Sequence, residues 1–323
     1  MQWENAGWTE SCCCEATAEE EQLGCRDPKN YRPISNLPFL SKIIERIVSF
    51  RIIAHMTQHQ LHERCQSAYK AGHSTETALV KVKEDILQAL DKKDGVLMVL
   101  LDLSSAFDTV CHSKLLKILN ERIGLCEVTL DWFRSYLTGR RQAVLVGSHS
   151  SPSTVLTRGV PQGSVLGPVL FTIYTLGLGD IIRRHGMEGH FYADDTQLYA
   201  VFSSDEEPSA VVSRMESCVS SIKTWMATNC LQLNDAKTDV ICFSSRRSSI
   251  TADNFDITVG DATIAPTPSV RNLGVTMDQH LVMLEFIKKT CAQCFLHLRD
   301  LSSIWSVLTQ EAAEPAWTTP MLS

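Results

Sequence analysis

The chain of 323 residues is 44% hydrophobic and 21% charged, which excludes a disordered tail and predicts one large core or two smaller ones. Its longest uninterrupted apolar run, Val96–Leu101, is too short for the roughly 20 residues that cross a bilayer, so no membrane partner is expected. The 12 cysteines are scattered through a chain whose amino terminus lacks a signal-peptide pattern. They indicate a reducing, intracellular compartment, without distinguishing nucleus from cytoplasm.

The net charge of -7 is distributed unevenly. Residues 1–27 hold seven acidic residues and one arginine, whereas residues 28–98 hold 11 lysines and arginines against seven acids. The acidic excess returns in residues 204–323, with 14 acids against nine basic residues. A basic amino-terminal half of the folded region favours a partner that carries phosphate.

The first predicted elements are a leader and two helices. Residues 1–27 show neither helical nor strand periodicity, which predicts a loosely ordered leader. Apolar residues recur at helical spacing over Ser41–Gln60, directly after Pro38, and again over Thr75–Asp91. Both segments are predicted helices.

Two groups of histidines and cysteines could bind a metal ion. His55, His59, His62 and Cys65 fall at spacings of four, three and three, which could form a zinc site on a helix face. A polar helix edge near solvent or nucleic acid is the favoured alternative, because no supporting partner is visible. The single C-x-x-C pair at Cys291 has no second pair at zinc-ribbon spacing, which favours incidental thiols.

The middle of the chain alternates between short elements. Val96–Leu101 reads as a buried strand that ends at Asp102, where a carboxylate is either a helix cap or part of a site. Phe191–Tyr192 and Thr196–Phe202 flank Asp194 and Asp195 as a hairpin would. The other predicted elements are helices at Lys114–Asn120, Val128–Leu137 and Val211–Thr228, strands at Gln142–Val146, Asp239–Phe243 and Leu273–Thr276, and a loop over 159–168 that leads into Val169–Leu176.

Asp102 and the adjacent pair Asp194 and Asp195 are candidate catalytic residues. Adjacent carboxylates repel each other, and an arbitrary Asp-Asp pair usually lies in a solvated turn. A divalent cation reverses this balance, because Mg²⁺ binds a few carboxylate oxygens together with water and substrate phosphate. Two such ions stabilise both the attacking and the leaving oxygen in phosphoryl transfer. Three carboxylates from two strands suit that chemistry.

Several ordered motifs between residues 28 and 278 resemble those of reverse transcriptases of non-LTR (LINE-type) retrotransposons. Their sequences are most similar to those of L2/CR1-type elements. The central motif is Tyr192-Ala193-Asp194-Asp195. The other matching segments are Tyr31–Ser35, Gln66–Leu79, Leu100–Asp108, Arg158–Pro168, Leu233–Thr238 and Val270–Val275. So many motifs in the family's order make a chance match negligible.

The resemblance implies a role for each matching residue. It implies that Asp102, Asp194 and Asp195 bind two Mg²⁺ ions, for which Mn²⁺ can substitute, and that Lys237 acts as a general acid toward pyrophosphate. It implies that Phe107 is a steric gate against a ribose 2′-hydroxyl. The implied nucleotide-binding residues are Arg32, Leu103, Ala106, Phe107, Gln162 and Gly163, and the implied primer and template contacts are Tyr192, Asn272, Leu273 and Gly274.

The resemblance also implies the fold and the reaction. The fold would be α+β, a right-hand polymerase with an antiparallel palm sheet, and the reaction RNA-directed DNA synthesis from deoxynucleoside triphosphates on an RNA template and DNA primer. The expected domains are fingers at about 28–97 and 118–157, a palm at about 98–117 and 158–278, and a truncated thumb or degenerate tail at 279–323. The resemblance leaves the oligomeric state open.

Parts of the chain depart from the family. Residues 1–27 do not resemble it, and Lys70 and Ala71 stand where relatives usually carry an Arg-Lys pair, which provides fewer directional donors for phosphate. No endonuclease region precedes the matching segment, and no RNase H region follows it. The alternative interpretation is therefore a truncated or catalytically dead remnant of a retroelement, acting at most as a nucleic-acid-binding protein.

Overall fold

The computed structural model describes residues 9–16, 31–104, 106–146, 149–246, 248, 250–260 and 262–304, and only the backbone of 9–16, 31–33, 104 and 146. The helices are α1 (Phe39–Gln58), α2 (Thr75–Asp91), α3 (His112–Glu121), α4 (Glu127–Leu137), α5 (Leu166–Tyr174), α6 (Gly177–Arg184), α7 (Pro208–Thr228) and α8 (Leu284–Ile304). The strands are β1 (Thr9–Ala16), β2 (Tyr31–Asn36), β3 (Gly95–Leu101), β4 (Leu103–Ser104), β5 (Arg141–Val146), β6 (His149–Ser150), β7 (Thr154–Val155), β8 (Glu188–Tyr192), β9 (Asp195–Phe202), β10 (Gln232–Leu233), β11 (Asp239–Phe243), β12 (Ile257–Val259), β13 (Ala262–Ile264), β14 (Ser269–Asn272) and β15 (Val275–Asp278).

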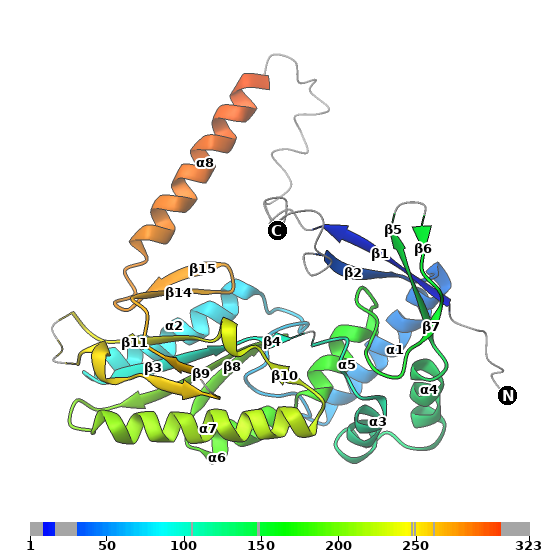
Figure 1. The fold of residues 1–323 in the computed structure, drawn as a ribbon, viewed down its shortest axis with the longest axis horizontal. Coiled ribbons are helices and arrows are strands. Elements are labelled where there is room, and N and C mark those ends of the chain that lie inside the picture. Colours follow the sequence, from blue (N-terminus) through cyan, green and yellow to red (C-terminus); the bar gives the residue numbers. More distant parts are fainter. Residues whose placement is uncertain are drawn as a thin grey trace.

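A four-stranded antiparallel sheet in the order β11-β3-β9-β8 forms the centre of the fold. Helix α2 covers one face of this sheet, and α6 and α7 cover the other (Figure 1). Strand β3 is apolar at nearly every position because both of its faces are buried. Val96 and Met98 pack with residues of α2, whereas Leu97 and Val99 pack with residues of α7. The predicted palm-like sheet and the hairpin around Asp194 are therefore confirmed.

A second sheet, in the order β2-β1-β5-β6 with β7 also paired to β5, lies beside α1 and α4 (Figure 1). It corrects the prediction of a loosely ordered leader, because residues 9–16 form strand β1; residues 1–8 and 17–27 lie outside the described residues. Strand β1 pairs antiparallel with β2 and parallel with β5. The β5 partners lie more than 130 residues along the chain, so local periodicity did not reveal this pairing.

The predicted helices are present with small shifts at their ends. Helix α2 begins after Ser74, which forms a reciprocal capping box with Thr77. Val169–Leu176, whose type the sequence left open, belongs mainly to α5, and α6 follows it. Residues Leu166–Arg184 have the length and apolar composition of a membrane-crossing helix, but 67% of that window is buried inside the protein, as in a core helix.

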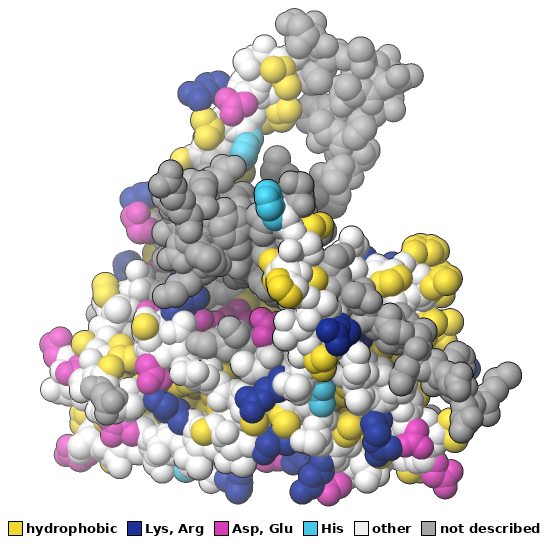
Figure 2. Space-filling model, turned by 45° about the vertical axis from the view of Figure 1, so that its right-hand side comes forward, with side chains coloured by type: hydrophobic (Ala, Val, Ile, Leu, Met, Phe, Trp, Pro, Cys, Tyr) yellow, Lys and Arg dark blue, Asp and Glu magenta, His cyan; other side chains and the backbone are white. Residues whose placement is uncertain are grey.

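The carboxyl-terminal part of the described chain is a hairpin followed by a projecting helix. The predicted strand Leu273–Thr276 is only half correct: Val275 and Thr276 begin β15, but Leu273 and Gly274 form the turn between β14 and β15, with φ of 46° and 84°. Glycine favours such a left-handed turn, and the local apolar pattern had concealed it. Helix α8 extends away from the body, with hydrophobic side chains exposed along it (Figure 1, Figure 2).

Candidate active site

The three candidate aspartates converge at one end of the central sheet. In the antiparallel register of β3 and β9, Leu101 pairs with Thr196, so Asp102 follows β3 where Asp195 begins β9. Asp194 lies in the two-residue turn between β8 and β9. Asp102 and Asp194 are 92 positions apart in the sequence. They meet because the end of β3 and the beginning of β9 lie side by side in the antiparallel pair.

The electrostatics of this end are those of crowded carboxylates. Desolvation, followed by the charges of Asp194 and Asp102, raises the pKa of Asp195 to about 6, while the charge of Lys237 opposes this rise. A bound cation would offset the part of the shift that the neighbouring carboxylates cause. Asp194 likewise raises the pKa of the Tyr69 hydroxyl, although desolvation contributes more.

Lys237 is a cation that lies beside Asp102. Its Nζ atom lies 3.4 Å from Oδ2 of Asp102, and its side chain is 69% exposed. Strand β10 brings it there, because Leu233 pairs with Leu103 and the Asn234 N–H donates to the Asp102 carbonyl at 2.9 Å. The short 3-10 helix Asp235–Lys237 follows directly. The structure thus brings Lys237 to the aspartates, as the sequence predicted.

The donor set fits a divalent cation. Hard carboxylate oxygens are the ligands that Mg²⁺ prefers, and here two of the carboxylates raise the pKa of the third, Asp195. Within the described residues, no three His, Cys, Asp or Glu side chains are close enough together to form a complete metal site. Because Mg²⁺ is usually held by one or two carboxylates plus substrate phosphates, an incomplete protein site is expected for such an ion.

The loop that contains Gln162 and Gly163 is tied to strand β2. The Ser35 N–H donates to the Gln162 carbonyl at 2.8 Å, and a Cβ atom on Gly163, whose φ is 92°, would lie 3.4 Å from Ile34. The positive φ favours glycine at position 163, whereas a Cβ atom at that distance would make only an ordinary van der Waals contact. Arg32 is also on β2, with its backbone paired to Glu15. Three of the predicted nucleotide-binding residues thus belong to one local assembly.

Phe107 lies between this loop and the core. Its ring is half-buried and stacks on Phe171 of α5 at 4.9 Å between centroids, and its carbonyl accepts from the Val160 N–H at 2.9 Å. Leu103 and Ala106 are only 5% and 4% exposed. Their side chains pack in the core, so a substrate contact from either residue requires its backbone.

The side chain of Asn272 is buried against strand β9. It is 4% exposed, accepts from the Gln197 amide at 2.9 Å and contacts the Met277 sulfur at 3.7 Å. Asn272 thus fastens the β14–β15 hairpin to strand β9, and a primer contact from it, which stays a prediction, would require its backbone. Leu273 and Gly274 form the tip of that hairpin and remain available for contact, as does the half-buried Tyr192 at the end of β8.

The sequence analysis did not identify Glu45, a buried carboxylate of α1 that caps the start of α5. It is 1% exposed, and its Oε2 atom accepts from the N–H groups of Val165 and Leu166 at 2.7 and 3.3 Å. Ser164 accepts from the Gly167 N–H at 2.8 Å, and Pro168 has no N–H. Every orphan donor at this helix start is therefore satisfied or absent. The apolar pattern gave no signal for it, because the buried face of α1 that holds Glu45 also contains the polar residues Ser41 and Ser49.

The histidine and cysteine group does not form a zinc site. Within the described part of the chain no group of three metal-binding side chains occurs. Instead, His55 contacts the Ile123 carbonyl at 2.8 Å and packs against His59, while His62 contacts the Thr57 hydroxyl at 3.1 Å. Cys291 and Cys294 are both exposed on α8.

Comparison with known proteins identifies the relatives of this chain. Residues 20–277 match the family model described as "Reverse transcriptase (RNA-dependent DNA polymerase)". The chain is 30% identical over 281 residues to a probable RNA-directed DNA polymerase from transposon BS of Drosophila melanogaster, covering 85% of this chain and 30% of the relative. It is 31% identical over 265 residues to the probable polymerase from transposon X-element of the same organism, covering 81% and 28%. The chain thus spans less than a third of the length of these relatives.

Solved structures share the fold at low sequence identity. A telomerase from Candida tropicalis, in the apo form and truncated from its C-terminal domain, has a TM-score of 0.55 and 10% identity, over 87% of this chain and 55% of that one. A Candida albicans telomerase in complex with a fragment of telomeric RNA has a TM-score of 0.54 and 11% identity, over 84% and 44%. The likeness establishes a polymerase fold.

Proposed function

The chain belongs to the reverse transcriptase (RNA-dependent DNA polymerase) family, and from that premise we propose that it extends a DNA primer along an RNA template. The observation that carries the proposal is the convergence of Asp102, Asp194 and Asp195 beside Lys237 at one end of the antiparallel sheet. The substrates would be deoxynucleoside triphosphates.

In this proposal Asp102 and Asp194 hold the metal ions, with Asp195 beside them. Held there, divalent cations would supply positive charge that favours attack by a primer 3′-hydroxyl and departure of pyrophosphate. Lys237, exposed and 3.4 Å from Asp102, can turn its ammonium group toward that pyrophosphate and donate a proton. Bound cations would also favour the charged form of Asp195, which desolvation and the neighbouring carboxylates disfavour.

The remaining residues of the site orient the nucleotide. The Gln162–Gly163 backbone and strand β2, joined through Ser35, would form one wall of the nucleotide site, and the Phe107 ring another. Template and primer would be held mainly by phosphate contacts to the basic region 28–98. Binding of that kind weakens steeply as salt concentration rises.

Primer extension tests the proposed function. The purified chain would be given an RNA template, an annealed DNA primer, all four deoxynucleotides and either Mg²⁺ or Mn²⁺. The proposal expects extension that stops when EDTA removes the metal and that weakens as salt is added. A folded protein that binds the template and primer but extends nothing would contradict the proposal and favour the non-catalytic remnant.

Phe107→Val is expected to relax discrimination between deoxynucleotides and ribonucleotides. The smaller side chain opens space beside the sugar, and loss of such a steric barrier is worth about 1–3 kcal/mol, or about 10- to 150-fold in the ratio of kcat/KM values. Single-nucleotide incorporation with dCTP and CTP measures this ratio. The matched control is Phe50→Val, because Phe50 is 76% exposed on α1, away from the core. An unchanged ratio in Phe107→Val would show that Phe107 is not a steric gate against ribonucleotides.

A further inference from the structure

Part of the segment between α1 and α2 pairs with β8, the edge strand of the central sheet. The Phe191 N–H of β8 donates to the Cys65 carbonyl at 2.8 Å, and the Ser67 N–H donates to the Phe191 carbonyl at 3.0 Å. The Ser67 hydroxyl also contacts Nε2 of His190 at 2.9 Å, and both residues are buried. Residues 65–67 are therefore held directly beside the strand that leads into Asp194.

Gln66 reaches from this segment to the catalytic turn. Its Oε1 atom accepts from the Ala68 N–H at 2.9 Å and from the Ala193 N–H at 3.3 Å. Ala193 immediately precedes Asp194 and has a φ of 57°. A two-residue hairpin turn with positive φ at its first central residue normally has glycine there, so alanine makes this turn strained. Such strain persists only where surrounding contacts compensate for it.

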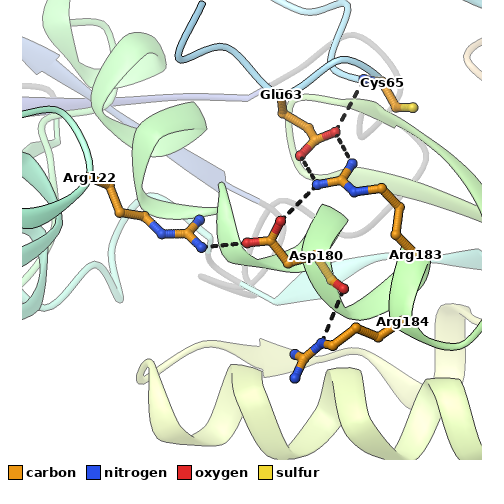
Figure 3. A network of polar contacts seen from close by, with 6 residues as sticks. All are labelled: Glu63, Cys65, Arg122, Asp180, Arg183 and Arg184. Atoms are coloured by element: carbon orange, nitrogen blue, oxygen red, sulfur yellow. Dashed lines mark hydrogen bonds and ion pairs between the residues drawn. The ribbon is translucent and has the colours of Figure 1, made fainter.

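An ion-pair network anchors the other end of the segment (Figure 3). Arg183 of α6 donates two hydrogen bonds to Glu63, at 2.7 and 3.1 Å, and Asp180 bonds both Arg183 and Arg122. Glu63 is only 9% exposed and also accepts from the Cys65 N–H at 3.4 Å. A bidentate pair of this kind fixes both distance and orientation.

The helix beneath this network is shaped to receive it. A Cβ atom on Gly179 would lie 2.1 Å from Oε2 of Glu63, so glycine is what lets the Glu63 carboxylate lie against α6. The segment from Glu63 to Ala68 is thus fixed to α6 at one end and to β8 along its middle. Gln66 is therefore presented to the turn by a rigid support.

We propose that Gln66 is a positioning residue, whose carboxamide oxygen holds the Ala193 N–H and thereby orients the Asp194 and Asp195 carboxylates toward a divalent cation. The inference rests on the proposed function, and deepens it by naming a residue that acts on the metal site without contacting the metal. Loss of a group that orients metal ligands through hydrogen bonds, without contacting the metal, typically lowers metal affinity 10- to 100-fold.

Mn²⁺ binding to the intact chain, measured from the electron paramagnetic resonance signal of free Mn²⁺, tests this inference independently of catalysis. Gln66→Met keeps the length of the side chain and removes the acceptor, and should raise the Kd for Mn²⁺ about 10-fold. Gln66→Glu keeps an acceptor oxygen and should stay within about threefold of the wild type. Gln88→Met is the matched control, since Gln88 is exposed on α2 and bonds only Glu84 among the contacts described.

Thermal unfolding and template-primer binding accompany these measurements, because a merely structural loss would lower both. The inference expects Gln66→Met to retain both properties and to recover much of its primer extension at high Mg²⁺ concentration. Wild-type Mn²⁺ affinity in Gln66→Met, or a Gln66→Glu as impaired as Gln66→Met, would overturn it. A wild-type chain that neither binds Mn²⁺ nor extends a primer would instead overturn the proposed function, and this inference with it.

Discussion

Asp194→Asn is expected to reduce primer extension by about 10³-fold or more. The substitution keeps the size of the side chain and removes the charge that a divalent cation requires. Asp194 occupies the turn between β8 and β9, where Asp102 and Asp195 already crowd the same end of the sheet. Two carboxylates without the third would hold the cations too weakly, and in the wrong place, for in-line transfer.

The measurement is the rate of single-nucleotide incorporation at saturating template and primer. Asp205→Asn is the matched control, because Asp205 is an exposed aspartate after β9 whose described contacts are to neighbouring serines. Its rate should stay within about twofold of the wild type, as for most surface substitutions. Comparable rates for Asp194→Asn and the wild type would exclude this carboxylate from catalysis.

Glu45→Ala is expected to lower the free energy of unfolding by about 3 kcal/mol. In the wild type, the Tyr136 hydroxyl donates to Oε1 of Glu45 at 3.1 Å, and the N–H groups of Val165 and Leu166 donate to Oε2. The substitution leaves these three donors without their hydrogen-bond acceptor. It also removes a negative charge from the positive end of α5. The carboxylate and the surrounding burial together hold the pKa of Tyr136 well above its usual value.

Urea denaturation followed by circular dichroism measures this effect. Glu45→Gln should recover part of the loss, because one carboxamide oxygen can still accept from the helix start. Glu84→Ala, an exposed glutamate of α2, serves as the control and should change stability by less than about 0.5 kcal/mol. Equal stabilities of Glu45→Ala and Glu84→Ala would show that the α5 start does not depend on this cap.

The cap also bears on the nucleotide site. Glu45 lies on α1, Tyr136 on α4, and the donors at the start of α5 directly follow the Gln162–Gly163 loop. Arg140, 1% exposed, lies over the Tyr136 ring at 4.9 Å, and burial lowers the pKa of its guanidinium to about 10. One buried polar cluster thus joins two helices to the loop. In Glu45→Ala we therefore expect weaker nucleotide binding together with the lost stability.

Local sequence patterns were sufficient for α1 to α4, α7 and strand β3, but not for α5, α6 and α8. A 3.6-residue apolar period predicted α1, α2 and α7, and an apolar run buried on both faces predicted β3. Asp102, Asp194 and Asp195 were identified from their motifs, and the antiparallel register then explained why they meet. Such features are readable because periodicity and short motifs depend on neighbouring residues alone.

Tertiary structure decided the features that depend on distant partners. Strand β1 exists because β2 and β5 pair with it, Asn272 is buried because Gln197 bonds it, and Glu45 is a helix cap because α1 crosses the start of α5. Gln66 gains its position from a strand more than 120 residues later. A hydrogen bond is stable only where its partner is held and water is excluded, and those conditions arise from the packed fold rather than from the local sequence.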